Sequence, residues 1–322
     1  MASSGPHVVV FCDLEGVTGV DDPTKFSEQY DPYNVFLTED VNASVRGLKK
    51  GGAEKVYVVD THSSGRNIRA DLLHPAADLV PPSLEVANLL FFCPPRFSDS
   101  LEIDIGHKVD AVVRIGAHAR RQTKGFMAHT MVSYPPTRLW VNGAETGEIG
   151  LYVLWAASRK IPVILFAGDD VAMDEAASLM PSAKRVVTKK SLSRNKCETL
   201  PPDSVRKLIE TEALEAMRGF RKVPPCDSPA NYVTELSWHS IDHAIACSPI
   251  PRARIKDESR ISYVAETFLE LRRFIDTAIS LAILHERKEL ISALRNFENV
   301  PEKISQWQNQ RRKDIGADWE SE

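Results

Sequence analysis

The sequence lacks the features that mark several large classes of protein. Its five cysteines are odd in number and widely spaced, with no C-x-x-C pair, which excludes a disulfide framework and a thiolate zinc site. No apolar run approaches the length of a membrane span, and Met1 to His7 shows no signal-peptide pattern. We therefore expect a reduced, cytoplasmic protein with no membrane partner.

The sequence also has little net charge and no common nucleotide or serine-nucleophile motif. The formal net charge is −4, which gives no attraction to nucleic acid, so we expect no nucleic-acid partner. There is no G-x-G-x-x-G, no P-loop and no G-x-S-x-G elbow. What is present is a chain of 322 residues, 43% hydrophobic and 26% charged, which can bury a sizeable core.

The first half alternates strand-like with helix-like segments. Short apolar runs predict strands over residues 8–12, 56–59, 111–115 and 163–166. A helix capped by Thr38 is predicted to end before Gly51. Because this alternation is typical of βαβ units, we expect an α/β fold with a mostly parallel sheet flanked by helices, and a second, smaller α/β domain.

Changes in composition divide the chain into three expected segments. Residues 1–190 are predicted to form a metal-binding catalytic α/β domain. Residues 191–285 form a smaller C-terminal domain, with an amphipathic helix after Pro201 and a long helix around Val264 to Leu284. Residues 286–322 form a helical and then charged extension that is partly disordered.

Acidic residues or histidines follow each predicted strand of the first half. The four segments are Asp13 to Gly16, Asp60 to Ser63, Gly116 to His118 and Ala167 to Asp170. Because the carboxyl ends of parallel strands share one edge of a sheet, these residues are expected to converge on one crevice. Capping of the following helix is the favoured interpretation of Asp169 and Asp170.

Each of these residues alone also has a plain structural explanation. Asp13 and Glu15 fit a solvated acidic loop, and His62, like any single histidine, fits a core or surface position. Asp60 either orients an imidazole or caps the next turn. Asp13 and Glu15, however, are two apart in extended chain and point the same way, so that a cation would offset their repulsion.

Taken together, the candidates indicate a metal centre. The five possible ligands exceed the three that one open catalytic zinc needs, and they suit two metals that share a carboxylate: Asp13, Glu15, His62, His118 and Glu148. Paired metals activate water and polarise a carbonyl, which is the chemistry of amide hydrolysis. His129 is left over as a proton shuttle, because imidazole titrates near neutrality.

Six motifs in the same order carry a resemblance to a known family. They are D-L-E-G-V-T-G (13–19), D-T-H-S (60–63), G-A-H-A-R (116–120), M-A-H-T-M (127–131), G-E-I-G-L (147–151) and A-G-D-D (167–170). The chain resembles the zinc-dependent D-aminopeptidases of the DppA type, metallopeptidases of a dipeptide operon, over most of residues 8–285.

The resemblance implies a ligand set, an assembly and an activity. Two Zn²⁺ per chain are implied, with Asp13 as the bridging ligand. Glu15 and His62 would complete one site, His118 and Glu148 the other, and His129 would act as general acid or base. A ring-shaped homo-oligomer, a pentamer or a decamer, is implied as well. The implied substrates are short peptides or amino-acid amides, including those with D-residues.

We therefore expect a metal-dependent aminopeptidase or amide hydrolase that releases N-terminal residues by metal-activated water. Zinc is the expected metal, and other divalent ions remain open. Residues Leu84 to Ser100 depart from the family and could reshape a substrate pocket or a subunit contact. The alternatives are a non-catalytic metal-binding protein of the same fold and a two-metal phosphoesterase.

Overall fold

The computed structural model describes residues 5–25, 31–63, 65–81, 108–294, 302–303 and 306 of the chain. Its larger sheet has the strand order β3-β2-β1-β4-β7-β8-β9. All neighbours are parallel except β8 and β9. The strands are β1 (His7–Cys12), β2 (Lys55–Asp60), β3 (Ala77–Leu79), β4 (Ala111–Ala117), β7 (Val163–Asp169), β8 (Lys184–Ser193) and β9 (Lys196–Thr199).

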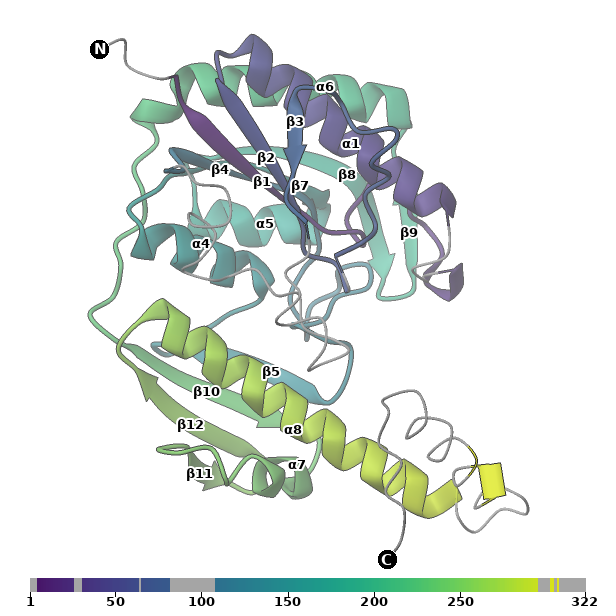
Figure 1. Ribbon diagram of the computed structural model, residues 1–322, viewed down its shortest axis with the longest axis vertical. Helices are drawn as coiled ribbons and strands as arrows, with labels where there is room; N and C mark the ends of the chain where they lie inside the picture. The colour runs from purple at the N-terminus through teal and green to yellow at the C-terminus, as the bar shows by residue number, and fades with distance from the viewer. Residues whose placement is uncertain are drawn as a thin grey trace, which may run out of the picture.

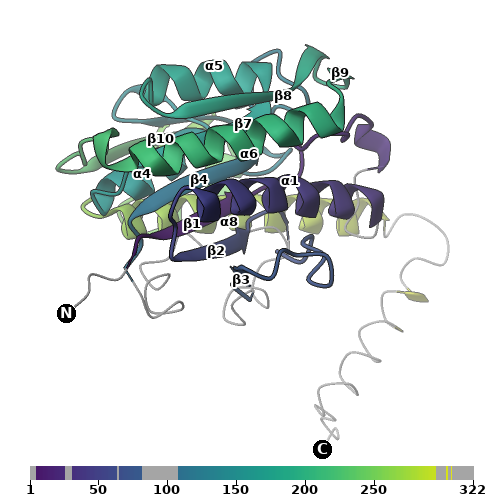
Figure 2. The same cartoon turned by 90° about the horizontal axis from the view of Figure 1, so that it is seen from above.

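Helices cover both faces of this sheet, which confirms the predicted α/β class. Figure 1 shows α1 (Asp31–Lys50) and α6 (Pro202–Gly219) above the sheet, with α4 (Glu148–Ser158) and α5 (Asp170–Leu179) below it. The same two upper helices lie nearest the viewer in Figure 2. The central strands β1, β4 and β7 are buried along their whole length because both of their faces are covered.

The first helix begins earlier than predicted. α1 includes Asp31 as its first residue, and the buried side chains of Tyr33 and Leu37 extend its apolar face beyond Thr38. Thr38 therefore lies inside the helix, where its hydroxyl donates to the carbonyl oxygen of Asn34 at 2.8 Å. The predicted end before Gly51 is confirmed.

A second, antiparallel sheet has the order β11-β12-β10-β5-β6. Its strands are β5 (Pro136–Val141), β6 (Ala144–Glu145), β10 (Tyr232–Trp238), β11 (Arg254–Asp257) and β12 (Arg260–Ala265). The helices α8 (Phe268–Leu294) and α7 (Ile241–Ala246) pack against it, as Figure 1 shows for α8. α8 also contacts α4, so that one continuous core joins the two sheets.

In the part of the chain that the structure describes, the remaining short elements are two 3₁₀ turns, η1 (Pro23–Lys25) and η2 (Phe220–Lys222). Several elements belong to a different sheet from the one that their position in the sequence suggests. β9 pairs with β8, and α6 packs on α1, so both belong to the larger sheet, whereas β5 and β6 join the second one. The division of the chain into three domains stays a prediction.

The long helix begins later than expected, at Phe268, because β12 takes up Arg260–Ala265 to pair with β10. It then continues to Leu294, into the stretch expected as a C-terminal extension. Leu84 to Ser100 lies outside the described residues. No helix in the described ranges is both long and apolar enough to cross a membrane.

Candidate metal centre

The candidate site lies where the strand order of the larger sheet reverses. From β1 the chain adds β2 and β3 on one side and β4, β7 and β8 on the other, which places a crevice at the carboxyl ends of β1 and β4. Asp13 and Glu15 follow β1, His62 follows β2 and His118 follows β4. The structure thus brings together side chains that the sequence separates by more than 100 residues.

Two glycines let the loops after β1 and β4 touch backbone to backbone. The amide of Gly16 donates to the carbonyl oxygen of Gly116 at 3.0 Å. A Cβ on Gly16 would lie 2.0 Å from the carbonyl oxygen of Ala117. Gly116 has φ +76°, and a Cβ there would lie 1.9 Å from the carbonyl oxygen of Asp13. Larger residues at either position would push the two loops apart.

Strand β8 holds the loop after β1 from its other side. The buried ammonium of Lys189 donates to the carbonyl oxygens of Glu15 at 2.7 Å and Val20 at 2.6 Å. The hydroxyl of Thr188 donates to the carbonyl oxygen of Gly16 at 2.6 Å. Three backbone oxygens of this loop are therefore fixed, and the carboxylates of the loop remain directed into the crevice.

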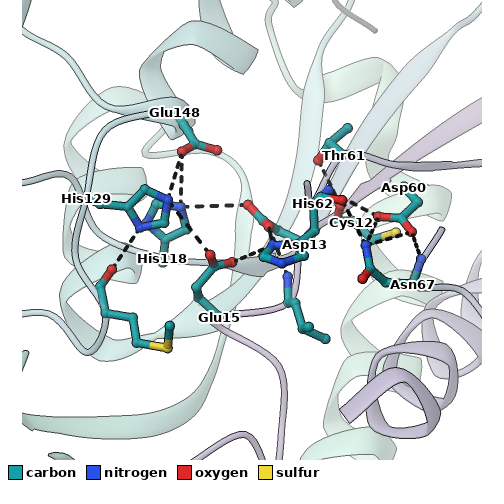
Figure 3. A network of polar contacts seen from close by, with 12 residues as sticks. Cys12, Asp13, Glu15, Asp60, Thr61, His62, Asn67, His118, His129 and Glu148 are labelled. Carbon is teal, nitrogen blue, oxygen red and sulfur yellow. Dashed lines mark hydrogen bonds and ion pairs between the residues drawn. The ribbon is translucent and has the colours of Figure 1, made fainter. Parts of the chain in front are cut away.

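Two clusters of possible ligands share Asp13, as Figure 3 shows. In the first, Nδ1 of His62 lies 3.1 Å from Oδ1 of Asp13 and 3.3 Å from Oε2 of Glu15. In the second, Nε2 of His118 lies 3.2 Å from Oε1 of Glu148 and 3.7 Å from Oδ2 of Asp13. Asp13 turns one oxygen to each histidine, so each cluster includes one of its oxygens.

Backbone carbonyls orient two of the histidines. Nδ1 of His118 lies 3.0 Å from the oxygen of Ala119, and Nδ1 of His129 lies 2.9 Å from the oxygen of Met127. Each Nδ1–H donates to its carbonyl, which leaves Nε2 as the ring nitrogen directed at the carboxylates. The two rings stack with centroids 4.1 Å apart.

His129 lies at the edge of the second cluster. Its Nε2 is 3.7 Å from Oε1 of Glu148 and 3.8 Å from Oε1 of Glu15. Glu15, His118 and His129 also form a third group whose ligand atoms lie within 4.8 Å of one another. The geometry therefore permits His129 to act as a ligand as well as to carry protons.

Charge compensation dominates the electrostatics of the site. Burial alone would lower the pKa of His62 and His118, but carboxylates, Glu15 for the first and Glu148 for the second, hold both pKa values well above their usual range. Burial alone would raise the pKa of Glu148, yet His118 lowers it to about 2. Such carboxylates attract cations, and a divalent ion can replace the protons on the imidazoles.

Two polar atoms at the centre suit a metal ion better than they suit the protein. Oε2 of Glu15 and Nε2 of His118 are buried. Each has an ion-pair contact, with Nδ1 of His62 at 3.3 Å and with Oε1 of Glu148 at 3.2 Å, but no hydrogen bond of good geometry among the described residues. The donor set of carboxylate oxygens and imidazole nitrogens is one that Zn²⁺ accepts. The residues present therefore fit a zinc centre.

Sequence reasoning missed one important residue of the site. Arg114 is 1% exposed, and its Nη2 donates to Oδ2 of Asp13 at 2.5 Å, while its Nη1 donates to the hydroxyl of Thr61 at 2.8 Å. Burial would raise the pKa of Asp13, but Arg114 and then His62 keep it well below its usual range. The signal in the sequence was a charged residue in the middle of an apolar strand.

Two acidic residues near the site have backbone roles. Asp60 accepts hydrogen bonds from the amides of His62, Asn67 and Ile68, so it orders the loop after β2. Asp169 caps α5 by accepting from the amide of Ala172 at 3.0 Å, which confirms the predicted cap. Its other oxygen accepts from the amide of Ala119, beside His118.

The candidate centre forms one end of a cavity of about 580 Å³. The segment Met127 to Pro135 lines one part of its wall, and the second half of α8 lines another. A cavity of this size holds a small organic ligand or a short peptide.

Comparisons with known proteins agree with this geometry. Residues 7–277 match the M55 peptidase family, described as D-aminopeptidase. The chain is 27% identical over 262 residues to a D-aminopeptidase of Bacillus subtilis (strain 168), covering 80% of this chain and 91% of that protein. It also resembles a solved structure, the Zn-dependent D-aminopeptidase DppA from Bacillus subtilis, a self-compartmentalizing protease. The TM-score is 0.77 and the identity 26%, over 86% of this chain and 98% of that one.

Proposed function

The chain belongs to the M55 family of D-aminopeptidases, and from that premise we propose that it releases the N-terminal residue of short peptides or amino-acid amides, including D-residues, with two zinc ions. As a member of this family the protein is a zinc-dependent hydrolase. The observation that carries the two-zinc proposal is the position of Asp13, which belongs to both ligand clusters and faces a different histidine with each oxygen.

The candidate ligands would form two sets around Asp13. Glu15 and His62 would hold one ion, and His118 and Glu148 the other. When bound, paired zinc ions lower the pKa of water and polarise the scissile carbonyl. Arg114 contributes by donating a hydrogen bond to Asp13, which fixes this carboxylate and offsets part of its negative charge.

His129 would move the proton of the reaction. Its Nδ1–H is engaged by the carbonyl oxygen of Met127, so only Nε2 can exchange a proton with substrate or water. Nε2 would accept a proton from the attacking water and donate it to the nitrogen of the leaving amine. The carbonyl of Met127 keeps the imidazole in the tautomer that this transfer needs.

The assembly expected from the family resemblance is also part of the proposal. The solved relative is a self-compartmentalizing protease. Enclosure of active sites requires several copies, so we propose a homo-oligomer of this chain, a ring of five-fold symmetry.

Hydrolysis of matched D- and L-alanine amides by the zinc-loaded protein tests the proposed activity. Wild type should release alanine, and His129→Gln should reduce kcat by about 10²- to 10⁴-fold while it retains zinc, because it removes a general acid–base group. Zinc binding without hydrolysis of either amide, or of short peptides, would instead support a non-catalytic metal-binding protein.

A further inference from the structure

The second half of α8 lines the cavity that holds the candidate metal centre. Its lining residues are Ile283, Glu286, Arg287 and Leu290, at spacings of three, four and seven, so they form one stripe along the helix. The first half of the same helix is buried in the core that α8 shares with the second sheet, through side chains such as Phe274 and Ala278. In Figure 1 the helix runs on past the second sheet.

This stripe lies beyond the region that the chain shares with its family by the sequence match. The match ends at Thr277, six residues before Ile283, whereas all the candidate metal ligands lie inside it. The ligands are thus part of the shared catalytic unit. The α8 wall lies outside the residues matched by the family model and lines the same cavity as the candidate ligands.

Contacts with the opposite rim hold the wall in place. The hydroxyl of Tyr134 donates to Oε1 of Glu286 at 3.1 Å, and Nε2 of His243 lies 2.6 Å from the same oxygen. His243 is 2% exposed, and its Nδ1 lies 2.9 Å from the hydroxyl of Ser240. Glu286 is therefore engaged by the protein itself and ties α8 to the rim.

The surfaces that remain around the cavity are largely apolar. Met127, Met131, Val132 and Pro135 line it together with the ring of Tyr134. On α8, Ile283 and Leu290 are two helical turns apart, about 10 Å along the helix axis. A methyl group cannot touch both of them, whereas an isobutyl or benzyl group covers much more of this wall.

We propose that the second half of α8 and the Val132 to Pro135 rim form a side-chain subsite that selects substrates with a bulky apolar residue beside the scissile amide. The subsite rests on the proposed function, since it takes its substrate from the same cavity. Burial of apolar surface supplies the selectivity, because each added methylene that leaves water strengthens binding.

Two exposed leucines of α8 provide a matched test. Leu290 lines the cavity and is 57% exposed, whereas Leu284 is 53% exposed and lies off the stripe. Neither side chain is buried in the core, so Leu290→Glu and Leu284→Glu should both fold. Leu290→Ser serves as a milder second variant. The substrates are phenylalanine and alanine amides, each as the D- and L-form.

Leu290→Glu should lower kcat/KM for phenylalanine amide by about tenfold and change it for alanine amide by less than about twofold. Leu284→Glu should leave both values within about twofold of wild type. Equal losses on both substrates, or no loss in either Leu290 variant, would overturn the subsite.

A binding measurement separates this proposal from the proposed function. Reduced-amide analogues, in which CH₂ replaces the carbonyl, cannot be hydrolysed, and calorimetry gives their Kd without turnover. Tighter binding of the phenylalanyl than the alanyl analogue, lost in Leu290→Glu, supports the subsite even if wild type hydrolyses no amide. Equal affinity for the two analogues refutes the subsite even if wild type hydrolyses both amides.

Discussion

At the scale of a single residue, Asp13 makes three contacts with charged or titratable side chains. It faces His62 and His118 with different oxygens, and it accepts a charge-assisted hydrogen bond from Arg114. A buried carboxylate in such a position is stable only while its charge is compensated. Arg114 supplies part of this compensation from the protein itself, and bound metal would supply the rest.

Replacement of Arg114 by methionine should therefore make stability depend more strongly on zinc. Loss of one partner from a buried ion pair costs about 3–5 kcal/mol. Metal bound at Asp13 would restore part of the lost free energy of unfolding. The rise in Tm on zinc addition should therefore be larger in Arg114→Met than in wild type. Scanning calorimetry with and without zinc measures this difference.

Arg159 offers the control for this substitution. Both arginines stack on an aromatic ring: the guanidinium carbon of Arg114 lies 4.2 Å from the centroid of Tyr152, and that of Arg159 lies 4.7 Å from the centroid of Trp155. Arg159, however, lies away from the ligand clusters. Arg159→Met should show the wild-type response to zinc. The same zinc response in Arg114→Met would mean that Arg114 does not compensate Asp13.

Gly116 should tolerate no side chain. Gly116→Ala would combine a positive φ with a Cβ 1.9 Å from the carbonyl oxygen of Asp13, so we expect a loss of more than about 3 kcal/mol in the free energy of unfolding. Zinc affinity should fall too, since the Asp13 loop must move. Chemical denaturation and zinc titration measure the two effects.

Substitution of Gly143 distinguishes the effect of backbone strain from that of the steric clash at Gly116. It also has a positive φ, +81°, but a Cβ there meets nothing within 4 Å. Gly143→Ala should therefore cost only about 1–2 kcal/mol and leave zinc affinity unchanged. Equal destabilisation by the two substitutions would rule out the close approach of the two loops as the cause.

At the scale of elements, strand β8 stabilises the loop after β1 through a buried lysine. Burial lowers the pKa of Lys189 to about 8, from about 10.4 for an unfolded lysine. Between these values the unfolded chain binds the proton that the folded chain releases, so the contribution of Lys189 to stability rises with pH from about 8 to 10.4. Below pH 8 its contribution is constant.

The difference in unfolding free energy between wild type and Lys189→Met should therefore change with pH. It should shift in favour of wild type by up to about 3 kcal/mol from pH 8 to pH 10.4. Urea unfolding of metal-free protein at several pH values measures it, and Lys190→Met provides a control. A constant difference across this range would show that Lys189 does not titrate as described.

The elements that the sequence predicted are those set by local pattern. Apolar runs marked β1, β2, β4 and β7, and their shared edge explains why Asp13, His62 and His118 come together. The predicted start of α1 was wrong. A threonine before an apolar run resembles an N-cap in the sequence, but Thr38 lies inside the helix, where its hydroxyl donates to the carbonyl oxygen of Asn34. The sequence did not predict β12, because its pairing with β10 depends on residues outside its own local sequence.

Functional contacts made by tertiary packing could not be predicted in the same way. The contact of Arg114 with Asp13 joins residues 101 apart, and nothing local to either one specifies it. The α8 wall depends on where the second sheet directs that helix. His129 was predicted as a proton shuttle from the chemistry of imidazole, whereas its Met127 contact depends on a backbone turn with φ +53° at that methionine.

At the scale of the whole molecule, two sheets share one core, and the cavity takes its walls from both parts. The metal cluster follows the strands of the larger sheet, while α8 belongs to the core of the second. The chemistry and the proposed side-chain selection can therefore vary independently, because different parts of the chain carry them.

The proposed assembly gives a further prediction at this scale. Light scattering after size-exclusion chromatography should give a mass near five or ten times the 35.9 kDa of one chain. Removal of zinc by a chelator should leave this mass unchanged if the ring forms through surfaces away from the metal centre. A mass of one chain across a range of concentrations would contradict the ring.

Location of zinc in crystals of the zinc-loaded protein tests the central claim most directly. Anomalous scattering at the zinc absorption edge should give two peaks per chain, on either side of Asp13, one next to Glu15 and His62 and the other next to His118 and Glu148. A single peak, or two peaks that do not share Asp13, would contradict the bridged two-zinc centre.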